Sequence, residues 1–260
     1  MLVYPQLSTG ALSQFPVKKQ RHLRTVVNAA ADGSSIKLAD TNGEYTEWSF
    51  EYAHLADAEM AALQQFFTEA EGTLNAFTFL DPTSNLLAWS DHLDNAVWVR
   101  GPQLTVAGGI ADPAGGANAW HLTNAGAGAQ NILQTISAPA GYQYCLSAYA
   151  RPAVALTITM LLGAGRSVKA LNTGWTRIVF AGSGDPAQAS ISFGIELPAG
   201  AAVDVYGLQA EPQAAASVYK SSTTGGVYEN ARLKDDTLTI TSTDVDQHSC
   251  KVNIYWAKHL

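Results

Sequence analysis

The histidines are the first residues to test for chemistry, because a nucleophilic enzyme needs a Ser or Cys near a His that a carboxylate orients. The six are scattered along the chain: His22, His54, His92, His121, His248 and His259. None belongs to a motif that gathers such partners, and the chain contains no HExxH, Walker loop, CxxC or dinucleotide-binding glycine motif. We therefore predict no catalytic residue, no metal site and no cofactor, and we expect a protein that is not an enzyme.

Paired carboxylates for glycoside hydrolysis are the other enzymatic arrangement to consider. The acidic residues in the middle of the chain fall mostly in predicted loops or at strand ends: Asp91, Asp94, Asp112, Asp185, Glu196, Asp204 and Glu211. Solvated acids are ordinary at such positions. A small glycan-degrading enzyme is kept as a third functional hypothesis.

Aromatic side chains indicate a different chemistry, the binding of sugars. A sugar site needs an exposed aromatic ring, against which the apolar side of a pyranose lies, and polar groups that bind the hydroxyls. Trp120, beside His121, and Tyr142, beside Gln143, flank predicted turns. We predict that Trp120 and Tyr142 face a glycan, and that Trp98 and Trp175 are buried in framework strands.

One dense basic cluster, Lys18-Lys-Gln-Arg-His-Leu-Arg24, stands near the N-terminus. The chain has a formal net charge of -7, and the cluster has no interleaved aromatic residues on which bases could stack, so we predict no specific nucleic-acid binding. We predict instead that Lys18, Lys19, Arg21 and Arg24 contact acidic residues of a neighbouring subunit. A solvated strand edge is the alternative interpretation.

The elements that position these residues are clearest between Trp48 and Pro82. Trp48–Leu55 alternates apolar and polar residues, as a half-buried strand does, and Asp57–Glu71 has the period of a helix that Asp57 caps and Gly72 ends. The helix is predicted to pack through one apolar face, made of Met60, Leu63, Phe66 and Phe67. Phe77–Leu80 follows as a short strand.

The flanks of the chain are predicted to form one discontinuous domain, residues 1–85 and 222–260. Residues 1–20 read as an extended arm that lies on a neighbour, Asp32-Gly33 offers a turn, and Asn42-Gly43 is a hairpin signal. Two strands near the C-terminus, Thr237–Thr241 and Cys250–Trp256, are too few to stand alone and should complete the first sheet.

Residues 86–221 are predicted to be an inserted β-sandwich. They hold six Lys or Arg and seven Asp or Glu among 136 residues, against 24 charged residues in the other 124. Eight strand-like runs recur between turn clusters, with no pattern for a long helix. Neither a secretory signal, nor a membrane span, nor a disulfide between Cys145 and Cys250 is expected.

The flanks resemble the hub domain of phage distal tail proteins and lambda-type minor tail proteins. The similarity lies in Asn42-Gly43, Trp48-Ser-Phe-Glu-Tyr52, the helix with Phe66-Phe67 near its end, Gly72, and Phe77-Thr-Phe-Leu-Asp-Pro82. The resemblance implies a tube-like β-barrel or sandwich hub and a homo-oligomeric ring, a hexamer in that family. It also implies contacts with the tail tube protein and with tail-tip hub proteins.

The middle resembles the carbohydrate-binding-module-like jelly rolls of phage adsorption proteins. The matching segments are Asn85-Leu-Leu-Ala-Trp-Ser90, Gly174-Trp-Thr-Arg177, Val205-Tyr-Gly-Leu-Gln-Ala-Glu211 and Ser217-Val-Tyr219. This resemblance implies binding of a host surface glycan. Because acidic residues are few, the calcium site of that family is not assigned to any ligand here.

The sequence thus predicts an all-β protein with one packed helix, consisting of a discontinuous hub and an inserted jelly roll. We expect a structural virion protein of a long-tailed phage, assembled in the host cytoplasm and located in the tail tip. It would be a distal tail ring that joins tail tube to tail tip and whose outward domain contacts host glycans. The alternative is an accessory adhesin whose main role is to bind host polysaccharide through the jelly roll.

Overall fold

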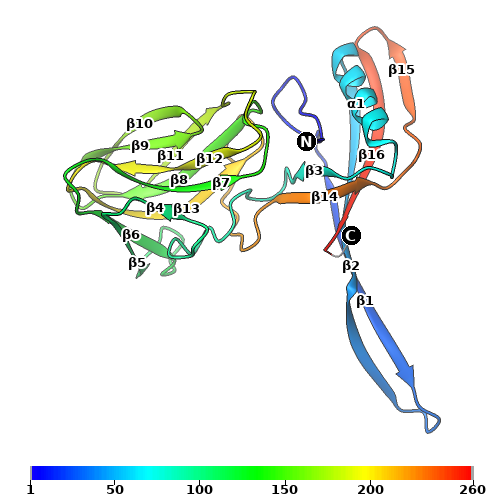
Figure 1. Ribbon diagram of the computed structural model, residues 1–260, viewed down its shortest axis with the longest axis horizontal. Helices are drawn as coiled ribbons and strands as arrows, with labels where there is room; N and C mark the ends of the chain where they lie inside the picture. Colours follow the sequence, from blue (N-terminus) through cyan, green and yellow to red (C-terminus); the bar gives the residue numbers. More distant parts are fainter. Residues whose placement is uncertain (1, 259–260) are drawn as a thin grey trace. The chain divides into compact units, whose positions relative to one another are not determined.

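The computed structural model describes residues 2–258, which form three antiparallel sheets and one α-helix, so the predicted fold class is confirmed (Figure 1). The chain divides into two compact units. Unit 1 comprises the residues up to Leu7, Ser13–Phe79 and the residues from Tyr228 on, and unit 2 comprises Ser8–Leu12 and Leu80–Val227. The short segment Ser8–Leu12, which the sequence places in the hub, therefore belongs with unit 2.

Unit 1 is built on one six-stranded sheet. Its strands run in the order β1 (Lys18–Ala29), β2 (Ser35–Leu55), β16 (Gln247–Ala257), β14 (Val227–Leu233) and β3 (Phe77–Leu80), and β15 (Ile240–Asp244) pairs with β16. The C-terminal strands do complete the sheet begun by the N-terminal half. Within one chain the sheet is open, because its two edge strands, β1 and β3, do not pair with each other. The expected barrel or sandwich is therefore not closed.

Helix α1 (Asp57–Ala70) packs against β16. Met60, Leu63 and Phe66 are buried and Phe67 is half-buried. Asp57 does not cap the helix as expected: Ala56 is the N-cap residue, and the Glu59 side chain accepts a hydrogen bond of 3.0 Å from its amide. At the other end, Glu71 already has a left-handed conformation, with φ 50°, before Gly72.

The core of unit 1 is mostly aromatic. Trp48 and Phe50 of β2, Phe79 of β3 and Tyr4 of the N-terminal segment are fully buried, with ring centroids of Trp48 and Phe79 4.9 Å apart. Phe66 of α1 meets Tyr4 edge-on at 5.2 Å. Residues 2–4 are thus held on their own unit, where the Thr78 amide donates to the Leu2 carbonyl, and they do not form part of an arm on a neighbour.

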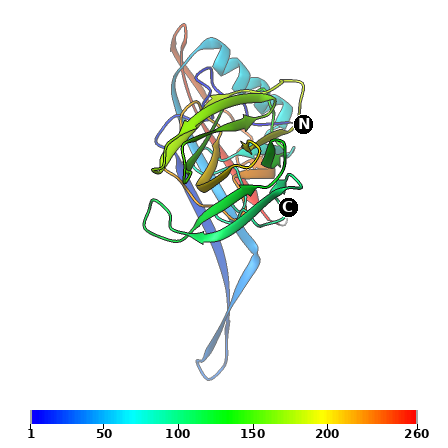
Figure 2. The ribbon, with the colours of Figure 1, turned by 90° about the vertical axis from the view of Figure 1, so that its left-hand side faces the viewer.

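Strands β1 and β2 continue beyond the rest of the sheet as a two-stranded hairpin, which we call the arm (residues 23–43; Figure 2). Asp32-Gly33 forms its turn, with the Ser34 amide donating to the Asp32 carboxylate at 2.9 Å. Asn42-Gly43 is not a hairpin turn: it lies inside β2, where the pairing register with β1 shifts between His22 and Arg24. A glycine suits such a bulge as well as it suits a turn, and here the Arg24 side chain lies against Gly43.

Unit 2 is a β-sandwich of two five-stranded sheets. The first has the order β10 (Gly165–Leu171), β9 (Leu156–Leu162), β12 (Ile191–Leu197), β7 (Gln130–Ile136), β4 (Val99–Arg100). The second has the order β11 (Thr176–Gly182), β8 (Tyr144–Arg151), β13 (Ala202–Glu211), β6 (Ala119–Asn124), β5 (Leu104–Ile110). The eight strand-like runs of the sequence correspond to strands of these two sheets, and β4 and β10 have no counterpart among them. Trp98, Tyr144 and Phe193 are fully buried between the sheets.

Candidate functional site

The outer faces of the two sheets in unit 2 differ in chemistry. On the first sheet, Ile158 and Met160 are buried, so the alternation of a strand turns Thr157 and Thr159 outward. On the second sheet, Ala148 and Ala150 are buried, which turns Tyr149 and Arg151 outward. Large aromatic and cationic side chains therefore gather on the second sheet.

Two tyrosines form the middle of this face. Tyr149 of β8 and Tyr206 of β13 stand opposite each other in register, with ring centroids 6.0 Å apart. The guanidinium of Arg177, which is opposite Tyr149 on β11, lies 5.5 Å from the Tyr149 ring centroid. Together with Trp175, which immediately precedes β11, Tyr149 and Tyr206 form what we call the aromatic face.

A glycine shapes the edge of the aromatic face. Gly207 has φ 66°, in the left-handed region, at the point where the register between β13 and β8 shifts. A Cβ there would lie 3.1 Å from the ring of Tyr219, so the missing side chain lets Tyr219 lie on the backbone. Tyr219 meets Tyr206 edge-on at 5.1 Å and extends the row of rings.

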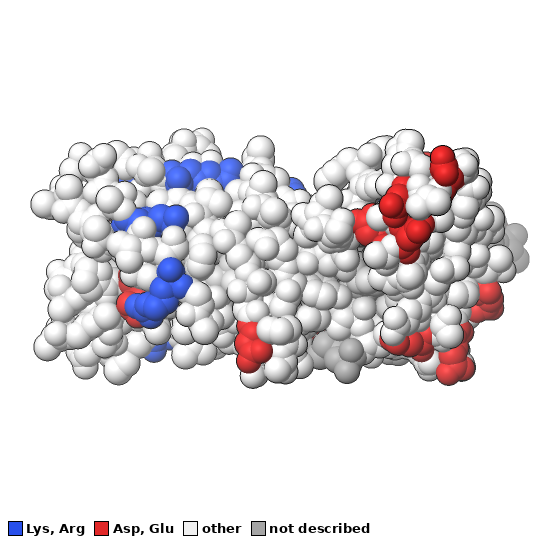
Figure 3. Space-filling view, turned by 90° about the horizontal axis from the view of Figure 1, so that it is seen from above, with Lys and Arg blue, Asp and Glu red and all other residues white. Residues whose placement is uncertain are grey.

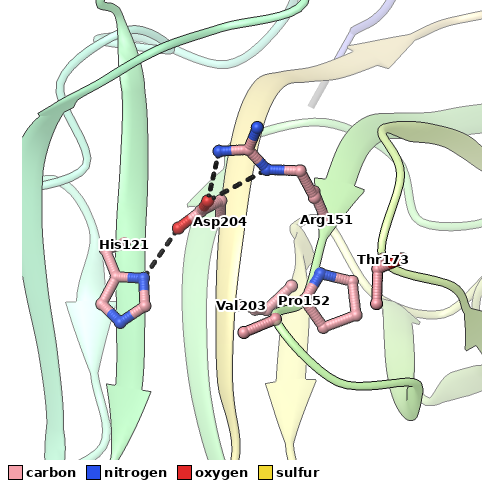
Figure 4. Close-up of a pocket in the computed structure, with 7 residues that line it drawn as sticks. His121, Arg151, Pro152, Thr173, Val203 and Asp204 are labelled. Carbon is pink, nitrogen blue, oxygen red and sulfur yellow. Dashed lines mark hydrogen bonds and ion pairs between the residues drawn. The ribbon is translucent and has the colours of Figure 1, made fainter.

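A pocket of about 350 Å³ opens at one end of the same sheet (Figure 4). Its lining residues are His121, Arg151, Pro152, Ala153, Thr173, Val203 and Asp204. Asp204 is paired in register with His121 on one side and with Arg151 on the other, so the three polar side chains share one rung of the sheet. The volume is at the lower end of the range of about 300–1,000 Å³ that is typical of small-molecule sites.

The Asp204 carboxylate organises the pocket. Its Oδ2 accepts hydrogen bonds from Arg151 Nη2 at 2.7 Å and Nε at 3.2 Å, and its Oδ1 is 2.7 Å from His121 Nδ1 (Figure 4). An ionised carboxylate only accepts, so Nδ1 carries the proton and Nε2 faces away from Asp204. The Arg151 guanidinium also lies 4.7 Å from the Trp175 ring centroid, which connects the pocket to the aromatic face.

Carboxylates and hydroxyls are few among the lining side chains. Asp204 is the one carboxylate among the lining residues, and glycoside hydrolysis uses a pair. Thr173 supplies the one lining hydroxyl. Among residues 2–258, no group of three or more His, Cys, Asp or Glu side chains could hold a metal ion, and no helix is long and apolar enough to cross a membrane.

The two residues predicted to face a glycan are not brought together. Through Val205, the strand pairing places Trp120 level with Ala150, near the end of β8. Tyr142 lies at the other end of this strand, just before its first residue, Tyr144. The six residue steps from Tyr144 to Ala150 span about 20 Å of strand. Trp120 points to the face opposite to its neighbour His121, and its indole N–H donates to the Asp91 carbonyl at 2.8 Å. Tyr142 is half-buried, and burial raises its pKa to about 12.

The predicted subunit contacts, Lys18, Lys19, Arg21 and Arg24, all lie exposed on β1. Three of them have partners on β2: Arg21 pairs with Glu44 at 3.0 Å, Arg24 pairs with Asp40 at 3.4 Å, and Lys19 Nζ lies 5.5 Å from the ring centroid of Trp48. Acidic side chains gather elsewhere in unit 1, at the end formed by α1 and β15 (Figure 3). We call Asp57, Asp244 and Asp246 the acidic end.

From the sequence, Tyr149, Trp175 and Tyr206 are only candidates in a larger set of aromatic residues expected to be mostly core, and the pocket residues His121, Arg151 and Asp204 are not recognised as a group. Trp175 was interpreted as a buried framework residue, yet it is half-buried and stacks on Arg151. A usable signal for the others is present in the sequence. Residues two apart in a strand lie on the same face, and polar or aromatic residues occur at this spacing in Tyr149 with Arg151 and in Asp204 with Tyr206.

Comparisons with known proteins match about half of the chain to β-sandwich folds. The C-terminal family 22 carbohydrate-binding module of Clostridium thermocellum has a TM-score of 0.41 at 12% identity, covering 54% of this chain and 99% of the module. A xylan-binding domain of Paenibacillus barcinonensis has 0.41 at 11%, covering 51% and 96%. The enzymatically active domain of tailspike protein 4 from bacteriophage CBA120 has 0.39 at 12%, covering 51% of this chain, which spans 22% of that chain.

No family model matches the sequence, and neither does any curated protein.

Proposed function

We propose that unit 2 binds a glycan on the aromatic face and does so without cleaving it. The observation that carries this proposal is the row of Trp175, Tyr149 and Tyr206, with Arg151 and His121 beside it. Half-buried rings fixed by strand pairing offer flat apolar surfaces, and the apolar side of a pyranose lies on such surfaces while nearby donors bind its hydroxyls.

Retention of the full-length protein on a panel of immobilised host-surface glycans tests this proposal. We expect Tyr149→Ala and Tyr206→Ala each to weaken binding about tenfold, the equivalent of about 1.4 kcal/mol. Thr157→Ala, on the outer face of the other sheet, is the control and should bind as the wild type does. Absence of binding to every glycan would refute the proposal, and release of glycan fragments would favour the hypothesis of an enzyme.

The variant Trp120→Ala tests whether the glycan lies on the aromatic face or at the site predicted from the sequence. Trp120 stands in a second group of rings, 6.4 Å from His92, which is 5.7 Å from Trp89. We expect Trp120→Ala to retain binding. Loss of binding in this variant alone, with folding intact, would move the glycan to the Trp89–His92–Trp120 group.

A second candidate function, assembly into the ring of a phage tail tip, is favoured by the arm. Its tip has no second layer, and Ile36 and Leu38, which share one face, are both more than half exposed. A two-stranded hairpin is at best marginally stable in water, so a cover over its apolar side chains would stabilise it.

We propose that the cover is a second copy of this chain. β1 carries Lys18, Lys19, Arg21 and Arg24 and no acidic residue, and the acidic end offers the opposite charge on a different surface of unit 1. A closed ring needs two different complementary surfaces on each copy, which these can supply. In this role the protein would join tail tube to tail tip, as the resemblance of its flanks implies.

Light scattering and electron-microscope class averages of the purified protein test the assembly role. We expect a ring of several subunit masses, and its loss in the double variant Ile36→Asp/Leu38→Asp, whose side chains lie on one face of the arm. Lys37→Glu, on the other face of the same hairpin, should still assemble. A protein that stays monomeric and never joins tail tubes would favour the adhesin alternative if it still bound glycans.

A further inference from the structure

We infer that the pocket of His121, Arg151 and Asp204 binds the carboxylate of an acidic sugar, so that the glycan recognised by the aromatic face contains uronic acid. This inference rests on the proposed glycan-binding function and specifies its ligand.

The charge balance of the pocket favours an anion. Asp204 is the one acidic side chain in the lining, and its two oxygens already accept hydrogen bonds from Arg151 and His121. Its charge is therefore offset within the protein. Arg151 keeps further N–H groups and has no acceptor, so it suits a ligand group that only accepts.

The geometry of Arg151 suits a planar carboxylate. A guanidinium has five N–H groups in a fixed fork, and Arg151 directs two of them to Asp204 Oδ2, which leaves three for a ligand. The stacking of the guanidinium on Trp175, at 4.7 Å, and its hydrogen bonds to Asp204 fix its plane before any ligand binds. Arginine forks of this kind bind carboxylates through two parallel hydrogen bonds.

The depth of the three side chains puts Arg151 and His121 in front of Asp204. The Asp204 side chain is 16% exposed, against 32% for Arg151 and 42% for His121. A ligand entering from solvent therefore meets the two nitrogen-bearing groups before it reaches the carboxylate. Because Arg151 also touches Trp175, a sugar that lies on the aromatic face can place an attached carboxylate in the pocket.

A neutral sugar fits the pocket less well. Its hydroxyls both donate and accept, so they need acceptors as well as donors. His121 Nε2 and Thr173 offer acceptors, but a hydroxyl cannot accept the two parallel hydrogen bonds that the Arg151 fork gives to a carboxylate. A neutral sugar therefore lacks this paired contact.

Titration calorimetry of the full-length protein with polygalacturonate, alginate and hyaluronate, and with their carboxyl-reduced forms, tests this inference. We expect at least one acidic polymer to bind and its reduced form to bind at least about tenfold more weakly, because a charge-assisted fork is lost. Arg151→Gln should weaken binding of the acidic polymer by a similar factor and weaken binding of the reduced polymer clearly less, because only the carboxylate uses the paired hydrogen bonds of the fork. Arg166→Gln, on the outer face of the other sheet, is the matched control and should have no effect.

The outcomes separate the inference from the proposed function. Equal binding of acidic and reduced polymers, or preference for neutral glycans, would overturn the carboxylate site and leave glycan binding intact. Equal binding of dextran sulfate would overturn the choice of a carboxylate in favour of any anion. Binding of no polymer, acidic or neutral, would refute both. The comparison of polymers needs only the wild type, so it decides the question even if Arg151→Gln fails to fold.

Discussion

At the scale of single residues, Asp204 shows how one side chain can order a site. It holds Arg151 and His121 at once, and its removal leaves both without their partner. We expect Asp204→Ala to lower the free energy of unfolding of unit 2 by about 1–2 kcal/mol, a value that allows for the partial exposure of the partners. Urea-dependent hydrogen exchange of β8 and β13 measures the change within this unit.

Glu196 provides the control for this prediction. Its side chain is 18% exposed, close to the 16% of Asp204, but it pairs with a single, well-exposed partner, Arg166. Glu196→Ala should cost no more than about 1 kcal/mol, as surface pairs do. Equal losses in the two variants would show that Asp204 has no special role in organising its neighbours.

A second carboxylate, Asp112, gives a pH dependence with a definite sign. It accepts hydrogen bonds from the amides of Ala114, Gly116 and Asn118, at 2.8–3.0 Å. The hydrogen bond from the Asn118 amide is the largest of the causes that lower the pKa of Asp112 below its ordinary value. A lowered folded-state pKa contributes stability that is fully present above the unfolded pKa, about 3.9, and is lost as the pH falls through the folded value.

We therefore expect the 112–118 loop to stay closed at neutral pH and to open in acid, below about pH 4. The amide resonances of Gly115 and Gly116, followed by NMR during an acid titration, report the opening. In Asp112→Asn these resonances should already be shifted at neutral pH and should not change with acid. A loop that opened at the same pH in both proteins would contradict the assignment.

Single residues also show what the sequence could predict at the site. The sequence predicts a sugar site among the aromatic side chains of the insertion, and it selects Trp120 and Tyr142 because they flank turns. Strand pairing brings a different pair together: Tyr149 and Tyr206 meet because β8 and β13 are neighbours in register. Which strands are neighbours depends on pairing between distant segments, which local alternation does not reveal.

At the scale of elements, helix α1 anchors unit 1 through Phe66. Phe66 is 5% exposed and lies 4.8 Å from the ring centroid of Phe77, whereas Phe67 is half-buried at the side of the interface. We expect Phe66→Ala to lower the free energy of unfolding of unit 1 by about 3–5 kcal/mol and Phe67→Ala to have a clearly smaller effect. Hydrogen exchange of β2 and β16 in urea measures both.

The reverse order of these two effects would show that the packed face of α1 is wrongly assigned. From the sequence alone, Phe66 and Phe67 are equally good candidates for the packed face, because adjacent side chains are only about 100° apart around the helix axis. The ring contacts of Phe66 with Tyr4 and Phe77 tell them apart. In the same way, Asn42-Gly43 has the chemistry of a turn and of a bulge, and the long-range pairing of β1 with β2 selects the bulge.

At the scale of the whole molecule, each unit has a core of its own: Trp48, Phe50 and Phe79 in unit 1, and Trp98, Tyr144 and Phe193 in unit 2. We therefore expect two calorimetric transitions. Phe66→Ala should lower only one of them, and a saturating acidic glycan should raise only the other, because a ligand stabilises the unit that binds it. A single transition that moved with both changes would show that the units unfold together.

Strand β2 has a mechanical consequence of its own. Its 21 residues, about 70 Å of extended chain, begin at the turn of the arm and end among the buried side chains of unit 1, including Trp48, Phe50 and Leu55. No loop interrupts this path. A pull on the arm would therefore act along one continuous strand and load the ladder of hydrogen bonds between β2 and β16 in shear.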